Sequence, residues 1–177
     1  MTAIEQNKKS DQYRLAKPYP PVQVEQKNLV YAKAMLDNVG GRISEMSAVS
    51  LYFYNHLQSK ELPEVARAFE TISIVEMHHL EIFASLAKEL GEDPRLWTVQ
   101  GENYVYWSPG YQQYPVSLPE LLQNALQGEE QAIRKYQQQL EWIEDDGVRA
   151  NLQRILEDEA LHVRIFQGFL EQYGCRK

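Results

Sequence analysis

The sequence has almost no cysteine and no long apolar segment, and both features narrow the class of protein. Its single cysteine, Cys175, excludes a disulfide framework within one chain and an iron site built on Cys-x-x-Cys pairs. No apolar run reaches the roughly 18 residues of a membrane-spanning helix. The start of the chain is polar and lacks the apolar centre of a signal peptide. We therefore expect a cytoplasmic protein with no membrane-embedded part.

Positive charge is also scarce. The chain has 18 Lys and Arg residues against 25 Asp and Glu, which gives a net charge of −7, and its basic residues form no cluster. Binding of a phosphate backbone needs a concentrated basic surface, so we do not expect a nucleic-acid partner. The length of 177 residues, with 44% hydrophobic residues, suits one globular domain with a full core.

The chain divides into an arm, a helical domain and a tail. Residues 1–28 contain Pro18, Pro20 and Pro21 with little periodicity, and they are expected to form an extended N-terminal arm. Residues 29–174 are expected to form a single four-helix bundle domain, and residues 175–177 a tail. This organisation predicts an all-α fold.

Four long helices are expected after a short helix at residues 28–38. Their predicted ranges are about 42–59, 63–91, 117–143 and from the Asp145-Asp146-Gly147 turn to Gly174. The segment 92–117 is rich in Pro, Gly and aromatic residues, and we expect a crossover without helix, packed by its own aromatic side chains. A long connection between the second and third helices makes those two helices parallel.

Two Glu-x-x-His motifs stand in the second and fourth of these helices, and their surroundings repeat with them. Glu76 and His79 correspond to Glu159 and His162 at an offset of 83 positions (159 − 76). Apolar residues around both motifs recur at alternating spacings of three and four, as in the inward stripe of a bundle helix. The motifs are therefore expected to be buried. A buried, unpaired carboxylate or imidazole costs roughly several kcal/mol, and a bound metal ion would remove that cost.

The first and third long helices supply matching residues. Glu45 precedes Tyr52 by seven positions, Glu129 precedes Tyr136 by the same spacing, and the offset between the two pairs is 84 (129 − 45). Seven residues are close to two helical turns, so each Glu lies on one line with its Tyr. Glu130 is an alternative to Glu129, but it lies about 100° away around the helix and outside the repeat.

Four carboxylates and two imidazoles form a set that two divalent cations would neutralise. The predicted metal ligands are Glu45, Glu76, His79, Glu129, Glu159 and His162. Mixed carboxylate and imidazole ligands suit iron or manganese, whereas the absence of thiolates disfavours structural zinc. The predicted cofactor is two manganese or two iron ions.

Several segments of the chain resemble the ferritin-like dinuclear carboxylate proteins, over roughly residues 19–172. Within that superfamily the sequence is most similar to manganese catalases and their spore-coat relatives, and next to rubrerythrins and bacterioferritins. The segments that carry the resemblance are Tyr19-Pro-Pro-Val22, Ser44-Glu45-Met-Ser-Ala48 with Tyr52, Glu76-Met-His-His-Leu-Glu81, Glu129 to Tyr136, and Glu159-Ala-Leu-His162. Two positions depart from these families: Ala132 where rubrerythrins usually carry a further Glu, and Gly128 where some manganese catalases carry an Arg.

The resemblance implies a ferritin-like fold and a non-haem oxidoreductase that acts on hydrogen peroxide, as a catalase or a peroxidase. Glu76 and Glu159 would bridge the two ions, and Glu45 and Glu129 would be terminal ligands. These four carboxylates are candidate catalytic residues, together with Tyr52 and Tyr136. Each tyrosine is a candidate hydrogen-bond donor to a ligand carboxylate or a redox-active phenol, and packing in the core is the alternative.

Two other functions remain open at this point. One is iron oxidation and sequestration, as in ferritins and bacterioferritins, and the other is a structural, metal-binding role of the spore-coat type. Met77 follows a predicted ligand, as does the haem-ligating Met of bacterioferritins, but helix geometry points it away from the site and we do not expect haem. The expected partners are hydrogen peroxide or dioxygen and further copies of the chain, in a dimer or a larger homo-oligomer.

Overall fold

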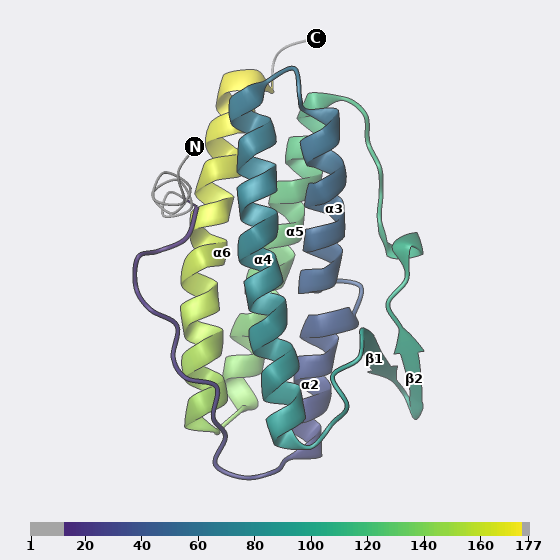
Figure 1. Ribbon diagram of the computed structural model, residues 1–177, viewed down its shortest axis with the longest axis vertical. Coiled ribbons are helices and arrows are strands. Elements are labelled where there is room, and N and C mark those ends of the chain that lie inside the picture. Colours follow the sequence, from purple (N-terminus) through teal and green to yellow (C-terminus); the bar gives the residue numbers. More distant parts are fainter. Residues whose placement is uncertain (1–12, 175–177) are drawn as a thin grey trace, which may run out of the picture.

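The computed structural model describes residues 13–174, and within them long helices lie side by side along one axis (Figure 1). The helices are α2 (Leu29–Gly40), α3 (Glu45–Gln58), α4 (Pro63–Leu90), α5 (Leu118–Trp142) and α6 (Asp146–Tyr173). Helices α2 and α3 follow each other along one side of the bundle, and α4, α5 and α6 form its other three columns (Figure 1). The predicted all-α, ferritin-like four-helix bundle is confirmed, with α4 and α5 parallel.

The helices begin and end at residues suited to those positions. Asp145 accepts a hydrogen bond from the backbone N–H of Val148 at 3.0 Å, which caps α6 as predicted. Helix α4 ends at Gly91, whose φ of 111° only glycine adopts without strain. The predicted start of the first long helix, near Arg42, is wrong by three residues. Ser44 is extended and caps α3, so the helix begins at Glu45.

The crossover between α4 and α5 contains a β-hairpin that the sequence analysis did not predict. Strand β1 (Trp97–Gln100) pairs antiparallel with β2 (Asn103–Tyr106), and the 3₁₀ turn η1 (Pro109–Tyr111) follows. The sequence does contain a hairpin pattern, because β-branched and aromatic residues lie on both sides of Gly101. In the structure Gly101 lies in the turn, with a φ of 64°. The expected aromatic packing is present: Trp97 lies 4.6 Å from Tyr104 between ring centroids.

Residues 13–28 form neither helix nor strand, and they run along α6 before passing under the bundle to α2 (Figure 1). Asn151 on α6 donates to the carbonyl of Pro21, and the backbone N–H of Glu25 donates to Asp145. This segment therefore covers the face of α6 with polar as well as apolar contacts.

The core consists of two apolar clusters with a polar layer between them. One cluster includes Phe83, Leu86 and Leu152 toward the α2 end, and the other includes Phe69 and Phe166 toward the opposite end. The two Glu-x-x-His motifs lie between these clusters in both α4 and α6. The bundle therefore places its most polar buried residues at mid-height. Among the described residues, no helix combines the length and apolarity needed to cross a membrane.

Candidate metal centre

Four helices bring all six predicted ligands together in the polar layer. Their side chains are nearly inaccessible to solvent, with exposed fractions of 0–3%. They fall into two groups in which the potential ligand atoms lie within 4.8 Å of one another: Glu45, Glu76, His79 and Glu159 in one, and Glu76, Glu129, Glu159 and His162 in the other. Because Glu76 and Glu159 occur in both groups, the geometry suits two adjacent cations that share two carboxylates.

The unsatisfied polar atoms of this layer fit bound cations. Both carboxylate oxygens of Glu159, Oε1 of Glu76 and Nδ1 of His162 are buried without a hydrogen-bond partner. Nδ1 of His162 lies 2.9 Å from Oε1 of Glu76, yet the two atoms are not oriented for a hydrogen bond. Buried polar atoms are rarely left unpaired. Lone pairs that converge in this way on a common space provide the donor set that iron or manganese prefers.

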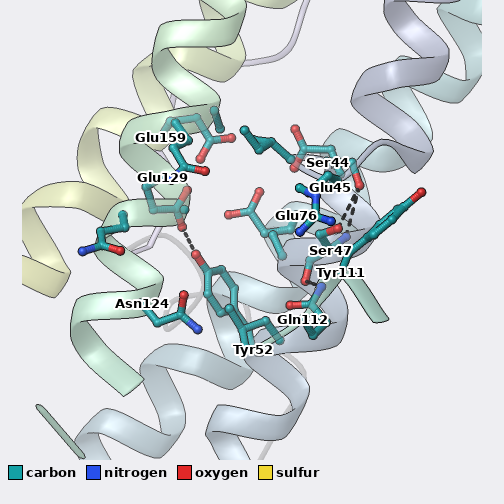
Figure 2. Close-up of a pocket in the computed structure, with 18 of the residues that line it drawn as sticks. Ser44, Glu45, Ser47, Tyr52, Glu76, Tyr111, Gln112, Asn124, Glu129 and Glu159 are labelled. Atoms are coloured by element: carbon teal, nitrogen blue, oxygen red, sulfur yellow. Dashed lines mark hydrogen bonds between the residues drawn. The ribbon is translucent and has the colours of Figure 1, made fainter. Parts of the chain in front are cut away.

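Each outer carboxylate is held by a tyrosine from a different helix. The hydroxyl of Tyr52 on α3 donates to Oε1 of Glu129 on α5, as Figure 2 shows. The hydroxyl of Tyr136 on α5 donates to Oε1 of Glu45 on α3. Burial, and then the nearby glutamates, raise the pKa of both phenols well above 10, so both remain protonated donors. Each tyrosine therefore orients a carboxylate on the opposite helix.

The carboxylates differ in their proton affinity. Burial, followed by the charge of Glu159, raises the pKa of Glu45 and of Glu129 well above the usual 4.5. Burial also opposes ionisation of Glu76 and Glu159, but the close, positively charged imidazoles of His162 and His79 outweigh it and lower the pKa of each. In the absence of metal, the outer pair therefore binds protons more readily than the central pair.

Protons on the two histidines offset the negative charge of Glu76 and Glu159. Burial opposes protonation of His162, but the charge of Glu76 and the carboxylate of Glu159, 3.4 Å from Nδ1, raise its pKa to about 10. Burial acts against His79 in the same way, and its hydrogen bond with Asp158 and the carboxylate of Glu159, 3.2 Å from Nδ1, outweigh it and raise the pKa well above 6.5. Two imidazolium ions thus balance two carboxylates, and cations that replace these protons keep the layer neutral.

A cavity of about 290 Å³ leads to this layer between α3 and α5. Glu45, Glu76 and Glu129 form part of its lining, and Gln112 of the crossover closes one side by donating to the backbone carbonyl of Ser47 at 3.0 Å (Figure 2). In this view Glu76 lies between Glu129 and Glu45. The candidate metal centre is therefore buried but reachable by a small molecule.

Three residues outside the predicted set support His79 directly or through one another. Asp158 lies with its Oδ2 atom 3.3 Å from Nε2 of His79, and the hydroxyl of Tyr19 donates to the same Oδ2 at 2.5 Å. Arg154 pairs with the other oxygen of Asp158 at 2.8 Å. Asp158 and Arg154 were not predicted from the sequence, although an Arg and an Asp four residues apart beside a ligand motif indicate an ion pair on one helix face.

Glu130 and Met77, the two alternatives that the sequence offered beside the ligands, lie where the sequence predicts. Glu130 does not share the burial of Glu129. Met77 is 53% exposed and points away from the centre. His78 forms a 3.7 Å pair with the exposed Glu81, outside both ligand groups. Cys175 and residues 1–12 lie outside the described residues.

A helical bundle with paired carboxylates and histidines in its core defines the ferritin-like class of proteins. The family model for rubrerythrin matches residues 41–170. A bacterioferritin from Desulfovibrio desulfuricans is 30% identical over 132 residues, which cover 72% of this chain and 68% of the relative. The chain therefore belongs to the rubrerythrin family of ferritin-like proteins.

Solved structures agree on the fold. KatB, a manganese catalase from Anabaena, superposes with a TM-score of 0.81 at 21% identity, over 90% of this chain and 79% of that one. The bacterioferritin of Rhodobacter capsulatus, which has a dinuclear site and a haem iron, gives a TM-score of 0.70 at 19% identity, over 84% of this chain and 88% of that one. The carboxylate and histidine cluster, seen together with these relatives, points to a dinuclear manganese or iron site.

Proposed function

We propose that this protein is a dinuclear manganese or iron oxidoreductase that decomposes hydrogen peroxide, as a catalase or a peroxidase. The observation that carries the proposal is a pair of ligand groups sharing Glu76 and Glu159, at the end of a cavity open to small molecules. Two redox-active ions held there would exchange two electrons with a peroxide. The manganese catalase KatB, which shares the fold, supports this choice.

The residues around the cavity fit a small, polar substrate. A water molecule occupies about 30 Å³ of liquid volume, so the 290 Å³ cavity easily admits a peroxide. The side chains of Glu45 and Glu129 line the cavity, and burial raises the pKa of each, which gives both carboxylates a high affinity for protons. These carboxyl groups are therefore suited to exchange protons with peroxide oxygens, while Tyr136 and Tyr52 keep them in place.

The test is the turnover of peroxide by protein loaded separately with Mn(II) and with Fe(II). Oxygen evolution from hydrogen peroxide would identify a catalase, and peroxide consumption that requires a reduced electron donor would identify a peroxidase. Glu76→Gln should abolish either activity because both ligand groups use Glu76, whereas Glu81→Gln, at an exposed position of the same helix, should not. Neither oxygen evolution nor donor oxidation in the metal-loaded protein would reject the proposal and favour a structural metal-binding role.

Iron oxidation and sequestration is the second candidate, favoured by the 30% identity to a bacterioferritin. Storage of a mineral requires a large hollow assembly of many chains. Light scattering of the native particle separates the two functions and also tests the expected homo-oligomer. A dimer or a hexamer could not enclose a mineral core, and such a result would leave the peroxide-consuming enzyme as the better description.

A further inference from the structure

The carboxylate sides of the two ligand groups are close to equivalent. Glu45 and Glu129 come from corresponding positions of α3 and α5, and each accepts a hydrogen bond from a buried tyrosine of the opposite helix. Both glutamates expose no more than 3% of their surface. The tyrosine hydrogen bonds therefore do not distinguish the two metal positions.

The two histidines differ in the groups that their outer nitrogen atoms contact. Nε2 of His79 faces the carboxylate of Asp158 at 3.3 Å and the hydroxyl of Tyr19 at 3.2 Å. Nε2 of His162 faces the backbone carbonyl of Tyr13 at 2.8 Å. One imidazole thus donates its proton to a carboxylate, and the other donates to a neutral carbonyl group.

The difference has its origin in the sequence. Asp158 immediately precedes Glu159, and the corresponding position before Glu76 is Val75, which is buried and cannot accept a hydrogen bond. The otherwise regular repeat of the two motifs is therefore broken at the residue that supports a histidine. His162 has to use a carbonyl of the N-terminal arm because α4 offers it no carboxylate.

Asp158 is held firmly in the orientation that serves His79. It is completely buried, and one of its oxygens accepts from the backbone N–H of Leu15 and forms an ion pair with the guanidinium of Arg154, both at 2.8 Å. The other oxygen accepts from Tyr19 and faces the imidazole. Arg154 in turn donates to the carbonyls of Lys17 and Leu15. These contacts fix the direction of the Asp158 carboxylate, so that one oxygen faces His79.

We propose that the two metal positions are inequivalent, and that the ion held by Glu45 and His79 binds before and more tightly than the ion held by Glu129 and His162. A histidine whose outer N–H donates to a carboxylate is a stronger electron donor through its other nitrogen. Asp158 is therefore a positioning residue that acts through His79. The inference rests on the dinuclear site of the proposed function but not on its peroxide chemistry.

Titration of metal-free protein with Mn(II), followed by calorimetry and electron paramagnetic resonance, tests the order of binding. We expect two separate binding steps, with the signal of magnetically isolated Mn(II) after the first equivalent and of a spin-coupled pair after the second. Two equal steps, or coupled pairs at half loading, would overturn the inference while leaving the dinuclear site intact. A protein that binds no Mn(II) and no Fe(II) would overturn the proposed function as well.

Variants of the two outer glutamates identify which of the two metal positions binds Mn(II) first. Glu129→Gln should retain the tight step and lose the weak one, and Glu45→Gln should do the reverse. The opposite pattern would contradict the assignment. These two variants decide the order even if substitution of Asp158 prevents folding.

Asp158→Asn should weaken the first step about 10- to 100-fold and leave the second nearly unchanged. The matched control is Glu157→Gln, because Glu157 pairs with Lys17 at the surface and does not contact a ligand. Equal weakening of both steps by Asp158→Asn would indicate a purely structural role for Asp158 and would overturn its role as a positioning residue.

Discussion

Glu129 and Glu130 are adjacent acidic residues with different environments, because one step along a helix turns the side chain by about 100°. Glu129 is 3% exposed, accepts from Tyr52 and belongs to a ligand group, whereas Glu130 belongs to neither group. A single position thus separates a residue of the metal centre from one on the flank of the helix.

Glu129→Ala should therefore remove at least one of the two bound ions, while Glu130→Ala should leave the metal content unchanged. The reason is that only Glu129 offers an oxygen within reach of Glu76 and Glu159. Metal analysis of the purified variants by mass spectrometry measures the difference. Equal metal loss in both variants would show that the wrong glutamate has been assigned to the site.

Gly128 lies in the wall of the cavity and leaves space there, because it has no side chain. A Cβ atom built at Gly128 would meet no other atom within 4 Å, and Gly128 lines the cavity beside Glu129. Gly128→Leu should fill part of this space and raise the KM for peroxide several-fold, with unchanged metal content. The matched control is Gly168→Leu on α6, where the space is equally free but lies outside the cavity lining. Similar KM values for both variants would show that substrate does not use this cavity.

At the scale of elements, the N-terminal arm belongs to the metal centre as much as the helices do. Its Tyr19 and the carbonyl of Tyr13 contact the two histidines from outside, and Arg154 of α6 attaches the arm to the bundle. The guanidinium of Arg154 lies 4.3 Å from the centre of the Tyr19 ring. An irregular segment thereby fixes the orientation of side chains on α4 and α6.

Arg154→Leu should destabilise the protein by roughly 3–5 kcal/mol, because it leaves the buried carboxylate of Asp158 without its ionic partner. For a chain of this length we expect the Tm to fall by about 10 °C or more. Thermal unfolding followed by circular dichroism provides the measurement. Arg164→Leu, at an exposed position of the same helix, should change stability by less than about 0.5 kcal/mol. A Tm unchanged by Arg154→Leu would show that the arm is not attached in this way.

At the scale of the whole molecule, the bundle concentrates its buried charge in one layer between two apolar clusters. Glu45, Glu129, His79 and His162 all have folded-state pKa values above their unfolded ones. The folded, metal-free protein therefore binds more protons than the unfolded chain at neutral and alkaline pH, and its stability falls as pH rises.

The Tm of metal-free protein should therefore decrease between pH 6.5 and 10. The histidine contribution is complete below the unfolded pKa of 6.5 and is lost as pH rises through the folded value, about 10 for His162. Metal ions compete with protons for Glu45, Glu129 and the two histidines, so the stabilisation by metal should grow with pH. Thermal scans with and without Mn(II) measure both trends, and a metal-free Tm that rises over this range would contradict the assigned protonation.

Much of this organisation could be predicted from the sequence because helices repeat regularly. The spacing of Glu76 and His79 and its recurrence at Glu159 and His162 placed four residues on inward faces, and the heptad from Glu129 to Tyr136 added another pair. The hairpin at residues 97–106 was missed because Pro, Gly and aromatic residues nearby favoured an irregular loop over two short strands.

The sequence by itself determined the four-helix bundle and the six residues that meet in its core, because apolar periodicity specifies which face of each helix is buried. Only the tertiary structure decided how those residues are supported. Tyr52 and Tyr136 reach across to glutamates of the opposite helix, and Asp158 supports His79 rather than His162. Such contacts join positions 77 to 91 residues apart, and their pairing depends on how the helices and the arm pack together in space.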